Sequence, residues 1–332
     1  MSKSYCSLGL MSGTSMDGID ASIIQSDGET KYKEIIDKYF EYPQSIFRDL
    51  LEFRDKINNT KDLKKFSKEV KNIEKEITLF HFKAVEEILK KTKVKIDFIG
   101  LHGQTIYHNE KEKISRQLGN GKLLSKLTKK TVIYDFRQND LKYGGRGAPL
   151  TPIFHKLIVE KYGIDLPVTI LNLGGIANIT KIEKKKIENK LHSLDIGPGN
   201  CLIDSWIRKN SKKNYDLHGL IAKSGKIKKN ILDEAIRKNY ENNLNEKKLT
   251  YDIKDFDLSF IKGLSLRDGA ATITEYTAEI LSDYFSNDMN IIICGGGRKN
   301  KFLVNKIEKK INKKLKLIDH FGIDGDFIES QA

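Results

Sequence analysis

The chain has 332 residues, 39% of them hydrophobic, and its 59 Lys and Arg against 45 Asp and Glu give a net charge of +14. That length exceeds what one hydrophobic core usually supports, so we expect two domains. No apolar run reaches the roughly 18 residues that span a bilayer, and the basic residues are scattered Lys rather than clustered Arg. We therefore expect neither a membrane attachment nor a nucleic-acid partner.

The cysteines and the start of the sequence indicate the compartment. Cys6, Cys201 and Cys294 lie far apart, are odd in number and show no metal-ligand spacing, which favours a reducing environment. Residues 1–4 are polar and basic, without the apolar stretch of a secretory signal. Both features predict a cytoplasmic protein.

The first predicted element is a hairpin with small residues at its tip, because strand-like runs at 5–10 and 21–24 flank it. Backbone N–H groups can point together at a phosphate only where side chains do not obstruct them, so Gly13-Thr14-Ser15 is a candidate phosphate loop. Asp17 and Asp20 could hold Mg²⁺ directly or through water. An ordinary hairpin turn explains this loop equally well when it is taken alone.

Two later strand-like runs, at 98–101 and 131–134, end in polar residues. His102 and Gln104 follow the first run, and Arg137 follows the second. Hydrogen-bonding groups at strand ends line ligand sites in open α/β sheets, so these three are candidate contacts for a polyhydroxylated substrate. A satisfied core histidine remains an equally good interpretation of His102.

A second hairpin repeats the plan of the first one. Runs at 168–173 and 176–180 are strand-like, and Gly174-Gly175 joins them, with Asn178 just beyond. The two glycines are a second candidate phosphate cradle. Glycine turns between strands are common, however, and a plain turn stays open as the alternative.

Asp195 follows a hydrophobic run at 192–194 and precedes Gly197-Pro198-Gly199-Asn200, which forces an extended turn. A carboxylate presented there could orient or deprotonate a nucleophile, as phosphoryl transfer requires. A turn former or helix cap is the alternative interpretation.

Long amphipathic patterns predict helices at 66–89, 268–285 and 300–311. The last of these follows a strand-like run at 290–294 and Gly295-Gly296-Gly297. A strand, a glycine turn and a helix in this order favour contact with a nucleotide at the helix N-terminus.

Several segments together resemble the anhydro-N-acetylmuramic acid kinase family, within the acetate and sugar kinase, heat-shock chaperone and actin superfamily. The segments run in family order along almost the whole chain. They are Gly9 to Asp20, Gly100 to Thr105, Leu171 to Asn178, Asp195 to Asn200, and Cys294 to Gly297.

The resemblance implies an α/β, two-lobed, actin-like ATPase fold with ribonuclease H-like lobes and an active site in the cleft between them. Composition places the boundary between the lobes near residue 130, giving lobes at 1–130 and 131–332. The resemblance implies that the last residues return to the first lobe. It also implies ATP and Mg²⁺ as cofactors, a small amino-sugar substrate and a homodimer. The implied reaction opens 1,6-anhydro-N-acetylmuramic acid with water and phosphorylates O6, in peptidoglycan recycling.

By the same resemblance, Asp195 is the general base that activates water, and Glu329 matches an active-site glutamate. Glu329 stands almost at the end of the sequence, where we expect it to be poorly fixed. The ATP contacts that the resemblance implies are Gly13, Thr14, Ser15, Met16, Asp17, Gly18, Ile19 and Asp20. The residue pattern adds Gly174, Gly175, Asn178, Gly295, Gly296 and Gly297 as candidates.

Two alternatives stay open at this point. Phosphate loops do not define the acceptor, so an actin- or chaperone-like ATPase with a protein partner shares most of these features. A remnant that binds nucleotide with low turnover is the other alternative, because of the short segment after Glu329.

Overall fold

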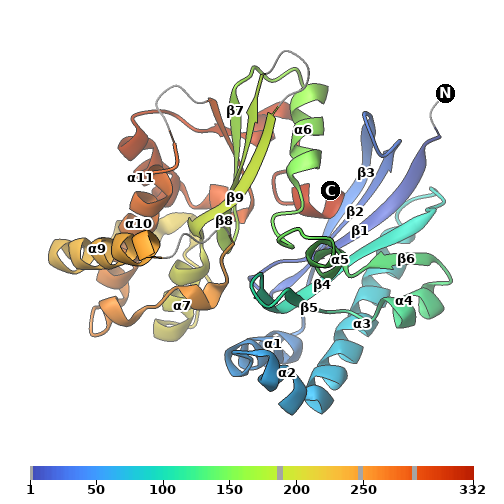
Figure 1. Ribbon diagram of the computed structural model, residues 1–332, viewed down its shortest axis with the longest axis horizontal. Helices are drawn as coiled ribbons and strands as arrows, with labels where there is room; N and C mark the ends of the chain where they lie inside the picture. Colours follow the sequence, from blue (N-terminus) through green and yellow to red (C-terminus); the bar gives the residue numbers. More distant parts are fainter. Residues whose placement is uncertain (1–2, 185–189, 246–249, 286–289) are drawn as a thin grey trace. The chain divides into compact units, whose positions relative to one another are not determined.

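The computed structural model describes residues 3–184, 190–245, 250–285 and 290–332 (Figure 1). Residues 1 and 2, which begin the polar start of the sequence, lie outside the described residues. The chain divides into two compact units, one formed by residues 1–157 and 326–332 and the other by residues 158–325.

The first unit is built on a six-stranded sheet in the order β3-β2-β1-β4-β5, with β6 also paired to β4. Its strands are β1 (Tyr5–Ser12), β2 (Gly18–Ser26), β3 (Tyr32–Glu41), β4 (Phe98–Asn109), β5 (Ile114–Leu118) and β6 (Thr131–Tyr134). Its helices are α1 (Gln44–Lys56), α2 (Thr60–Lys65), α3 (Ser67–Leu89), α4 (Gly121–Thr128), α5 (Phe136–Lys142) and α12 (Ile328–Gln331), and α6 (Pro152–Lys161) crosses the boundary.

Helix α3 covers one face of this sheet because its apolar residues recur on one side. Val70, Ile73 and Ile77 belong to the same buried cluster as Leu8 and Leu10 of β1. Successive side chains of a strand point to opposite faces, so Leu8 and Leu10 fix which face of β1 is the core face. The helix predicted at 66–89 is confirmed.

Strand β4 extends further than the sequence predicted. The run at 98–101 was expected to stop before His102, yet the strand continues to Asn109 and pairs with β5. His102 and Gln104 therefore lie within a strand rather than after one. The pairing to β5 supplies hydrogen bonds that a pattern of apolar residues does not reveal.

The second unit repeats the strand order of the first. Its sheet runs β11-β10-β7-β8-β9, with β7–β8 and β8–β9 antiparallel and β7–β10 and β10–β11 parallel. Its strands are β7 (Val168–Leu173), β8 (Ile176–Glu183), β9 (Lys190–Pro198), β10 (Asn290–Cys294) and β11 (Lys316–Leu317). Its helices are α7 (Cys201–Asn210), α8 (Leu220–Lys223), α9 (Lys229–Asn245), α10 (Leu266–Ser282) and α11 (Lys301–Ile311).

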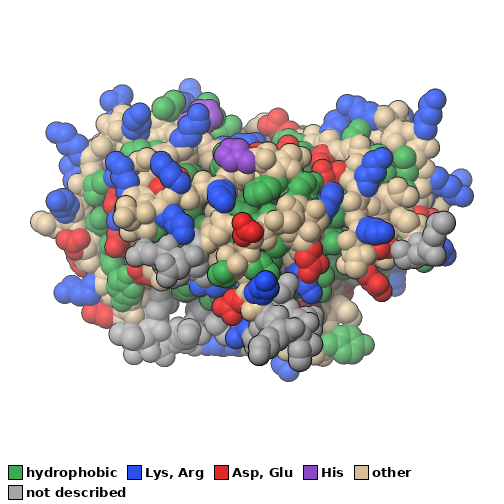
Figure 2. Space-filling view, turned by 90° about the horizontal axis from the view of Figure 1, so that it is seen from above, with side chains coloured by type: hydrophobic (Ala, Val, Ile, Leu, Met, Phe, Trp, Pro, Cys, Tyr) green, Lys and Arg blue, Asp and Glu red, His purple; other side chains and the backbone are tan. Residues whose placement is uncertain are grey.

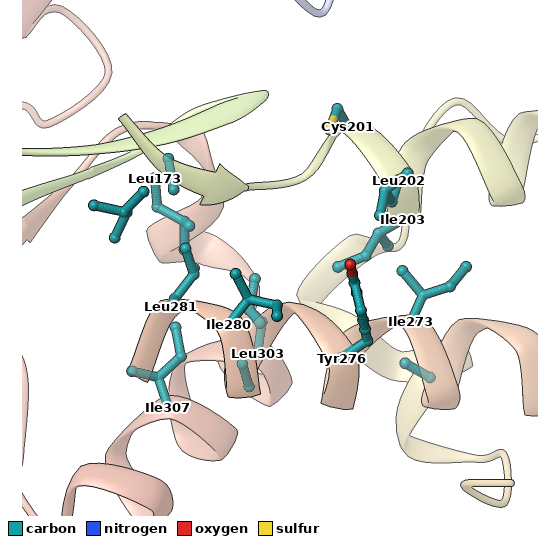
Figure 3. Close-up of a cluster of buried hydrophobic side chains, with 14 of the residues drawn as sticks. Leu173, Cys201, Leu202, Ile203, Ile273, Tyr276, Ile280, Leu281, Leu303 and Ile307 are labelled. Atoms are coloured by element: carbon teal, nitrogen blue, oxygen red, sulfur yellow. The ribbon is translucent and has the colours of Figure 1, made fainter. Parts of the chain in front are cut away.

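Helix α10 forms the centre of the second core. Figure 3 shows Ile273, Tyr276, Ile280 and Leu281 of α10 between side chains of the neighbouring helices and of Leu173. Ser265 caps this helix by accepting a hydrogen bond from the backbone N–H of Asp268, 3.1 Å away. Leu173, directly before Gly174, and Cys201, shortly after Gly199, belong to the same core.

The shared topology confirms the two-lobed, actin-like expectation. In both units an antiparallel three-strand meander is followed by a strand that pairs in parallel with its first strand, and a further strand pairs in parallel with that one. The units divide between Leu157 and Ile158, whereas composition placed the boundary near residue 130. Strand β6 explains the difference, because it is a strand of the first sheet.

The end of the chain returns to the first unit, where α12 packs on β1 and β2. Ser330 and Gln331 are only 5% and 2% exposed. Ser330 Oγ lies 2.6 Å from Ser22 Oγ, and Gln331 donates from Nε2 to Asp37 Oδ2 over 2.9 Å. The two residues that follow Glu329 are thus held by hydrogen bonds, and Ile328 before it is buried, contrary to the poorly fixed end that we expected.

The surface shown in Figure 2 carries Lys and Arg scattered among Asp and Glu. In the described part of the chain, no helix combines the length and the apolar composition that crossing a membrane requires.

Candidate active site

The first candidate loop lies between β1 and β2 of the first unit. Asp17 is fixed from two sides: its backbone carbonyl accepts from the N–H of Tyr42 over 2.8 Å, and its carboxylate accepts from the hydroxyl of Ser15. Met16 adopts a positive φ of 62°, which closes the turn tightly. The backbone between residues 13 and 17 is therefore preorganised.

The side chains of this loop do not all face the same way. Met16 and Ile19 belong to the buried core of the first unit, so only their backbone can contact a ligand. Gly18, Ile19 and Asp20 lie in β2 rather than in the turn. Residues 13–15 and Asp17 are half-buried and make up the accessible part of the loop.

Gln104 of β4 holds the loop between β1 and β2 by a hydrogen bond to its backbone. Its side chain is fully buried, and its Nε2 donates to the carbonyl oxygen of Gly13 over 2.9 Å. Among the described residues, its Oε1 is buried without a hydrogen-bond partner. A buried amide oxygen without a partner is costly, so it marks a place where a ligand or water would add a donor.

His102, Arg137 and Gly147 form a chain of hydrogen bonds. Arg137 donates from Nε to His102 Nε2 over 2.7 Å and from Nη1 to the carbonyl oxygen of Gly147 over 2.7 Å. The backbone N–H of Gly147 is held by Asp140 Oδ2, again at 2.7 Å. Arg137, in the first turn of α5, thus ties β4 to the loop that contains Gly147.

The contacts of His102 fix its protonation. Because Nε2 accepts from Arg137, Nδ1 carries the proton and donates to the carbonyl oxygen of Gly103 over 2.7 Å. Burial, followed by the charge of Arg137, lowers the pKa of His102 to about 3. His102 is therefore a neutral imidazole at neutral pH.

The glycine turns of the second unit lie against one another. The backbone N–H groups of Gly199 and Cys201 donate to the carbonyl of Gly175, and that of Asn200 donates to Gly174, at 2.8–3.1 Å. The amide of Asn200 also lies beside Gly297, where a Cβ would come within 2.7 Å of it. Three turns that are distant in sequence therefore meet at one end of the sheet.

Asp195 lies inside β9, in register with Asn178 of β8. Its side chain is 5% exposed, and Oδ2 accepts a hydrogen bond from the backbone N–H of Tyr251 over 2.9 Å. A β-bulge at Ala177/Asn178 interrupts the regular ladder next to it. The sequence predicted a carboxylate after the strand; the structure instead places it within the strand, beside the bulge.

Asn178 adds a second polar group at this place. Its Oδ1 is buried and, within the described ranges, has no hydrogen-bond partner. The ring of Tyr251, whose N–H holds Asp195, stacks on Phe256 with ring centroids 5.3 Å apart. A buried carboxylate and a buried amide oxygen thus occupy neighbouring positions on adjacent strands.

The third glycine turn follows β10. Gly295 has a φ of 80°, and its N–H donates to the carbonyl of Gly325 over 2.9 Å. Residues 296–299 form a short 3₁₀ helix before α11, so the glycines do not open the α-helix directly as predicted. The extra turn results from backbone hydrogen bonds that residue pattern alone does not specify.

A search of the described residues finds no cluster of three or more His, Cys, Asp or Glu side chains that could hold a metal ion. Mg²⁺ in phosphoryl-transfer sites typically uses only one or two carboxylates and completes its shell with phosphates and water. Asp17 and Asp20, near the first loop, fit that smaller requirement. Both carboxylates lie close enough to Tyr39 to raise its pKa, after the larger effect of burial.

Comparison with known proteins decides the family. Residues 5–332 match the family model described as "Anhydro-N-acetylmuramic acid kinase". The chain belongs to the anhydro-N-acetylmuramic acid kinase family. A relative of that name in Pelagibacter ubique is 52% identical, over 100% of this chain and 91% of its own. Relatives in Zymomonas mobilis and Rhodospirillum rubrum are 36% and 32% identical over 98% of this chain and 90% and 85% of theirs.

Membership of this kinase family confirms the resemblance and the enzyme class expected from the sequence motifs, a phosphotransferase with an alcohol acceptor. The actin- or chaperone-like ATPase is not favoured. The residue-level roles expected for the family stay predictions.

The sequence-predicted residues fall into two sets. The first unit brings together residues 13–20, Gln104 and, through α12, the backbone at Glu329. The second unit brings together Asp195, Asn178 and the three glycine turns. Sequence reasoning missed Tyr251, because no residue pattern shows that its backbone N–H bonds to Asp195, which is distant in the sequence. It also missed Arg298, although its place directly after three glycines was a usable signal.

Proposed function

We propose that this chain opens 1,6-anhydro-N-acetylmuramic acid with water and transfers the γ-phosphoryl group of ATP to O6, giving N-acetylmuramic acid 6-phosphate and ADP. Family membership supports the choice of substrate. The observation that carries the chemistry is Asp195, a buried carboxylate oriented by the backbone N–H of Tyr251. We place the reaction in cytoplasmic peptidoglycan recycling.

In the first step Asp195 takes a proton from water, and the water oxygen forms a bond to the anomeric carbon of the sugar. The bond between that carbon and O6 breaks, which frees O6. A carboxylate acts as a general base only from a fixed position within hydrogen-bond reach of the water. The N–H of Tyr251 engages Oδ2 and so keeps the Asp195 side chain in one orientation.

In the second step O6 attacks the γ-phosphorus and the bond to the β-phosphate oxygen breaks, releasing ADP. Such transfers depend mainly on positioning and on stabilising negative charge. The backbone of residues 13–15 and the turns at Gly174-Gly175 and Gly295-Gly297 supply N–H groups for this purpose. Mg²⁺, held by Asp17 or Asp20, would neutralise charge on the phosphates.

Substrate contacts follow from the first unit. The unpartnered Oε1 of Gln104 is an acceptor that a sugar hydroxyl could satisfy. His102 and Arg137 are already bonded to each other and to the loop at Gly147, so we assign them the shaping of the substrate pocket. Glu329, next to the buried Ser330, is the second catalytic candidate.

The test is ADP release from purified protein with Mg-ATP and, in turn, 1,6-anhydro-N-acetylmuramic acid, N-acetylmuramic acid, glucose or no acceptor. We expect turnover with the anhydro sugar alone. Asp195→Asn should bind ADP normally and lose turnover by about 10³-fold or more, in the range of removing a general base. The matched control is Asp216→Asn, because Asp216 is a buried carboxylate of the same unit that accepts hydrogen bonds from the backbone N–H groups of Ile221 and Ala222.

Each other outcome has a distinct meaning. ADP release without any acceptor would support an ATPase and contradict the proposal. Equal turnover with N-acetylmuramic acid would contradict ring opening, because that sugar has no anhydro bridge. Nucleotide binding without turnover would favour the low-turnover remnant.

A further inference from the structure

Arg298 follows the three glycines directly, and its charge is buried. Its side chain is 5% exposed, and it makes two hydrogen bonds to Asp319: Nε to Oδ2 and Nη2 to Oδ1, both 2.8 Å. Nη2 also donates to Asp324 Oδ1 over 3.1 Å. A buried guanidinium needs such partners, and the planar fork of Arg matches a carboxylate in a way that Lys does not.

The same side chain reaches the glycine turn itself. Nη1 of Arg298 donates to the carbonyl oxygen of Gly295 over 3.1 Å, while the N–H of Gly295 donates to the carbonyl of Gly325. Both backbone groups of Gly295 are therefore engaged. Gly325 must lack a side chain, because a Cβ there would come within 2.7 Å of Arg298 Nε.

The next residue of the turn, Gly296, is exposed. A Cβ built on Gly296 meets no described atom within 4 Å, so this position borders open space. Gly295 is thus anchored to the protein, whereas Gly296 is accessible. This is the arrangement expected of a turn whose N–H groups receive a ligand.

We propose that Arg298 is a positioning residue for the nucleotide: it holds the Gly295-Gly297 turn in its ligand-ready shape without touching the ligand. The proposal rests on the nucleotide role given to this turn under the proposed function. The clamp also ties the turn to Gly325, directly before the point where the chain returns to the first unit at Asp326. The shape of the turn thereby depends on one side chain.

The test compares Arg298→Lys and Asp319→Asn with wild type. The dissociation constant of ADP is measured by calorimetry without sugar, and the KM values of ATP and sugar are measured separately. Arg298→Lys keeps the charge and loses the fork, so we expect ADP affinity and the KM of ATP to worsen about tenfold. The KM of the sugar should stay within about twofold, and Asp319→Asn should give a smaller effect in the same direction.

Lys306→Met is the matched control. Lys306 pairs with Glu275 at 2.8 Å, with side chains 21% and 14% exposed, and joins α10 to α11 in the same unit. Its loss should lower the melting temperature while leaving ADP affinity within about twofold of wild type.

The outcomes separate a positioning role from a structural one. Unchanged ADP affinity in folded Arg298→Lys and Asp319→Asn would overturn the proposal, as would equal weakening in Lys306→Met. If Arg298→Lys does not fold, Asp319→Asn decides, since it leaves Arg298 with Asp324 and Gly295. Wild-type protein that binds ADP but never turns over the anhydro sugar contradicts the proposed function alone. Wild-type protein that does not bind ADP contradicts both.

Discussion

The carbonyl oxygen of Ser330 lies so close to Gly9 that a Cβ at residue 9 would come within 1.8 Å of it. Only glycine allows α12 to lie against β1 at this distance. Glu329 is the neighbour of Ser330, and β1 leads into the loop that begins at Gly13. The absence of a side chain at Gly9 therefore fixes where Glu329, the candidate catalytic glutamate, lies relative to the first phosphate loop.

Gly9→Ala should displace α12 and, with it, Glu329. We expect kcat to fall by about 100-fold, the scale of misplacing a catalytic group by ~1 Å. Carboxypeptidase should also digest the end of the variant faster than that of wild type. Ser22→Ala is the control, because it removes only the hydrogen bond to Ser330 and should cost about 1 kcal/mol of stability. Wild-type kcat in Gly9→Ala would refute a catalytic role for the segment.

Gln104→Glu should weaken ATP binding. The amide of Gln104 donates to the carbonyl of Gly13, and a carboxylate there would face that carbonyl with a second acceptor. We expect the KM of ATP to rise about tenfold or more, measured by ADP release at saturating sugar.

Gln117→Glu provides the matched control in the adjacent strand β5. Gln117 donates to the hydroxyls of Thr105 and Ser115, which can turn and donate to a carboxylate instead. The KM of ATP should then change by less than about threefold. An equal effect of the two substitutions would mean that Gln104 supports the sheet rather than the loop.

Tyr251→Pro deletes the N–H that orients Asp195. A hydrogen bond donated to a carboxylate favours its charged form, so losing it should move the acid limb of the pH–rate profile to higher pH. We also expect kcat to fall about tenfold, while ADP affinity is retained. Tyr251→Ala keeps the N–H and loses the side chain, whose ring stacks on Phe256 and whose hydroxyl is hydrogen-bonded to Tyr284. Its acid limb should coincide with that of wild type.

The first unit should lose stability in mild acid. Burial lowers the pKa of His81 and of His155 from 6.5 to about 4. Because these folded values lie below the unfolded one, the unfolded chain takes up protons first as the pH falls from about 6.5 to about 4. The free energy of unfolding should therefore drop there, by up to about 1.4 kcal/mol per pH unit for each histidine.

Denaturant unfolding at several pH values measures that slope. His81→Leu removes, at a fully buried position, one of the four histidines of this unit whose pKa burial lowers, which are His81, His102, His108 and His155. Its slope between about pH 6.5 and 4 should therefore be shallower than that of wild type. Equal slopes would show that His81 takes up its proton over the same pH range in the folded and the unfolded protein.

The sequence by itself determined the elements and the family. Glycine turns, apolar periodicity and the order of motifs are local properties, so the hairpin at residues 13–18, the helix at 66–89 and the turn at 295–297 could be read from residue types alone. The repeated hairpin also indicated two similar lobes. Family membership then followed from the joint occurrence of segments that are weak individually.

Only the tertiary structure decided which partner each polar group has. Gln104 holds the Gly13 carbonyl, Tyr251 orients Asp195, and Arg298 clamps Gly295, all through contacts between residues distant in the sequence. A hydrogen bond depends on distance and direction, whereas the sequence gives only donors, acceptors and their order. The close approach of Ser330 to Gly9 likewise exists only once β1, β2 and α12 have packed together.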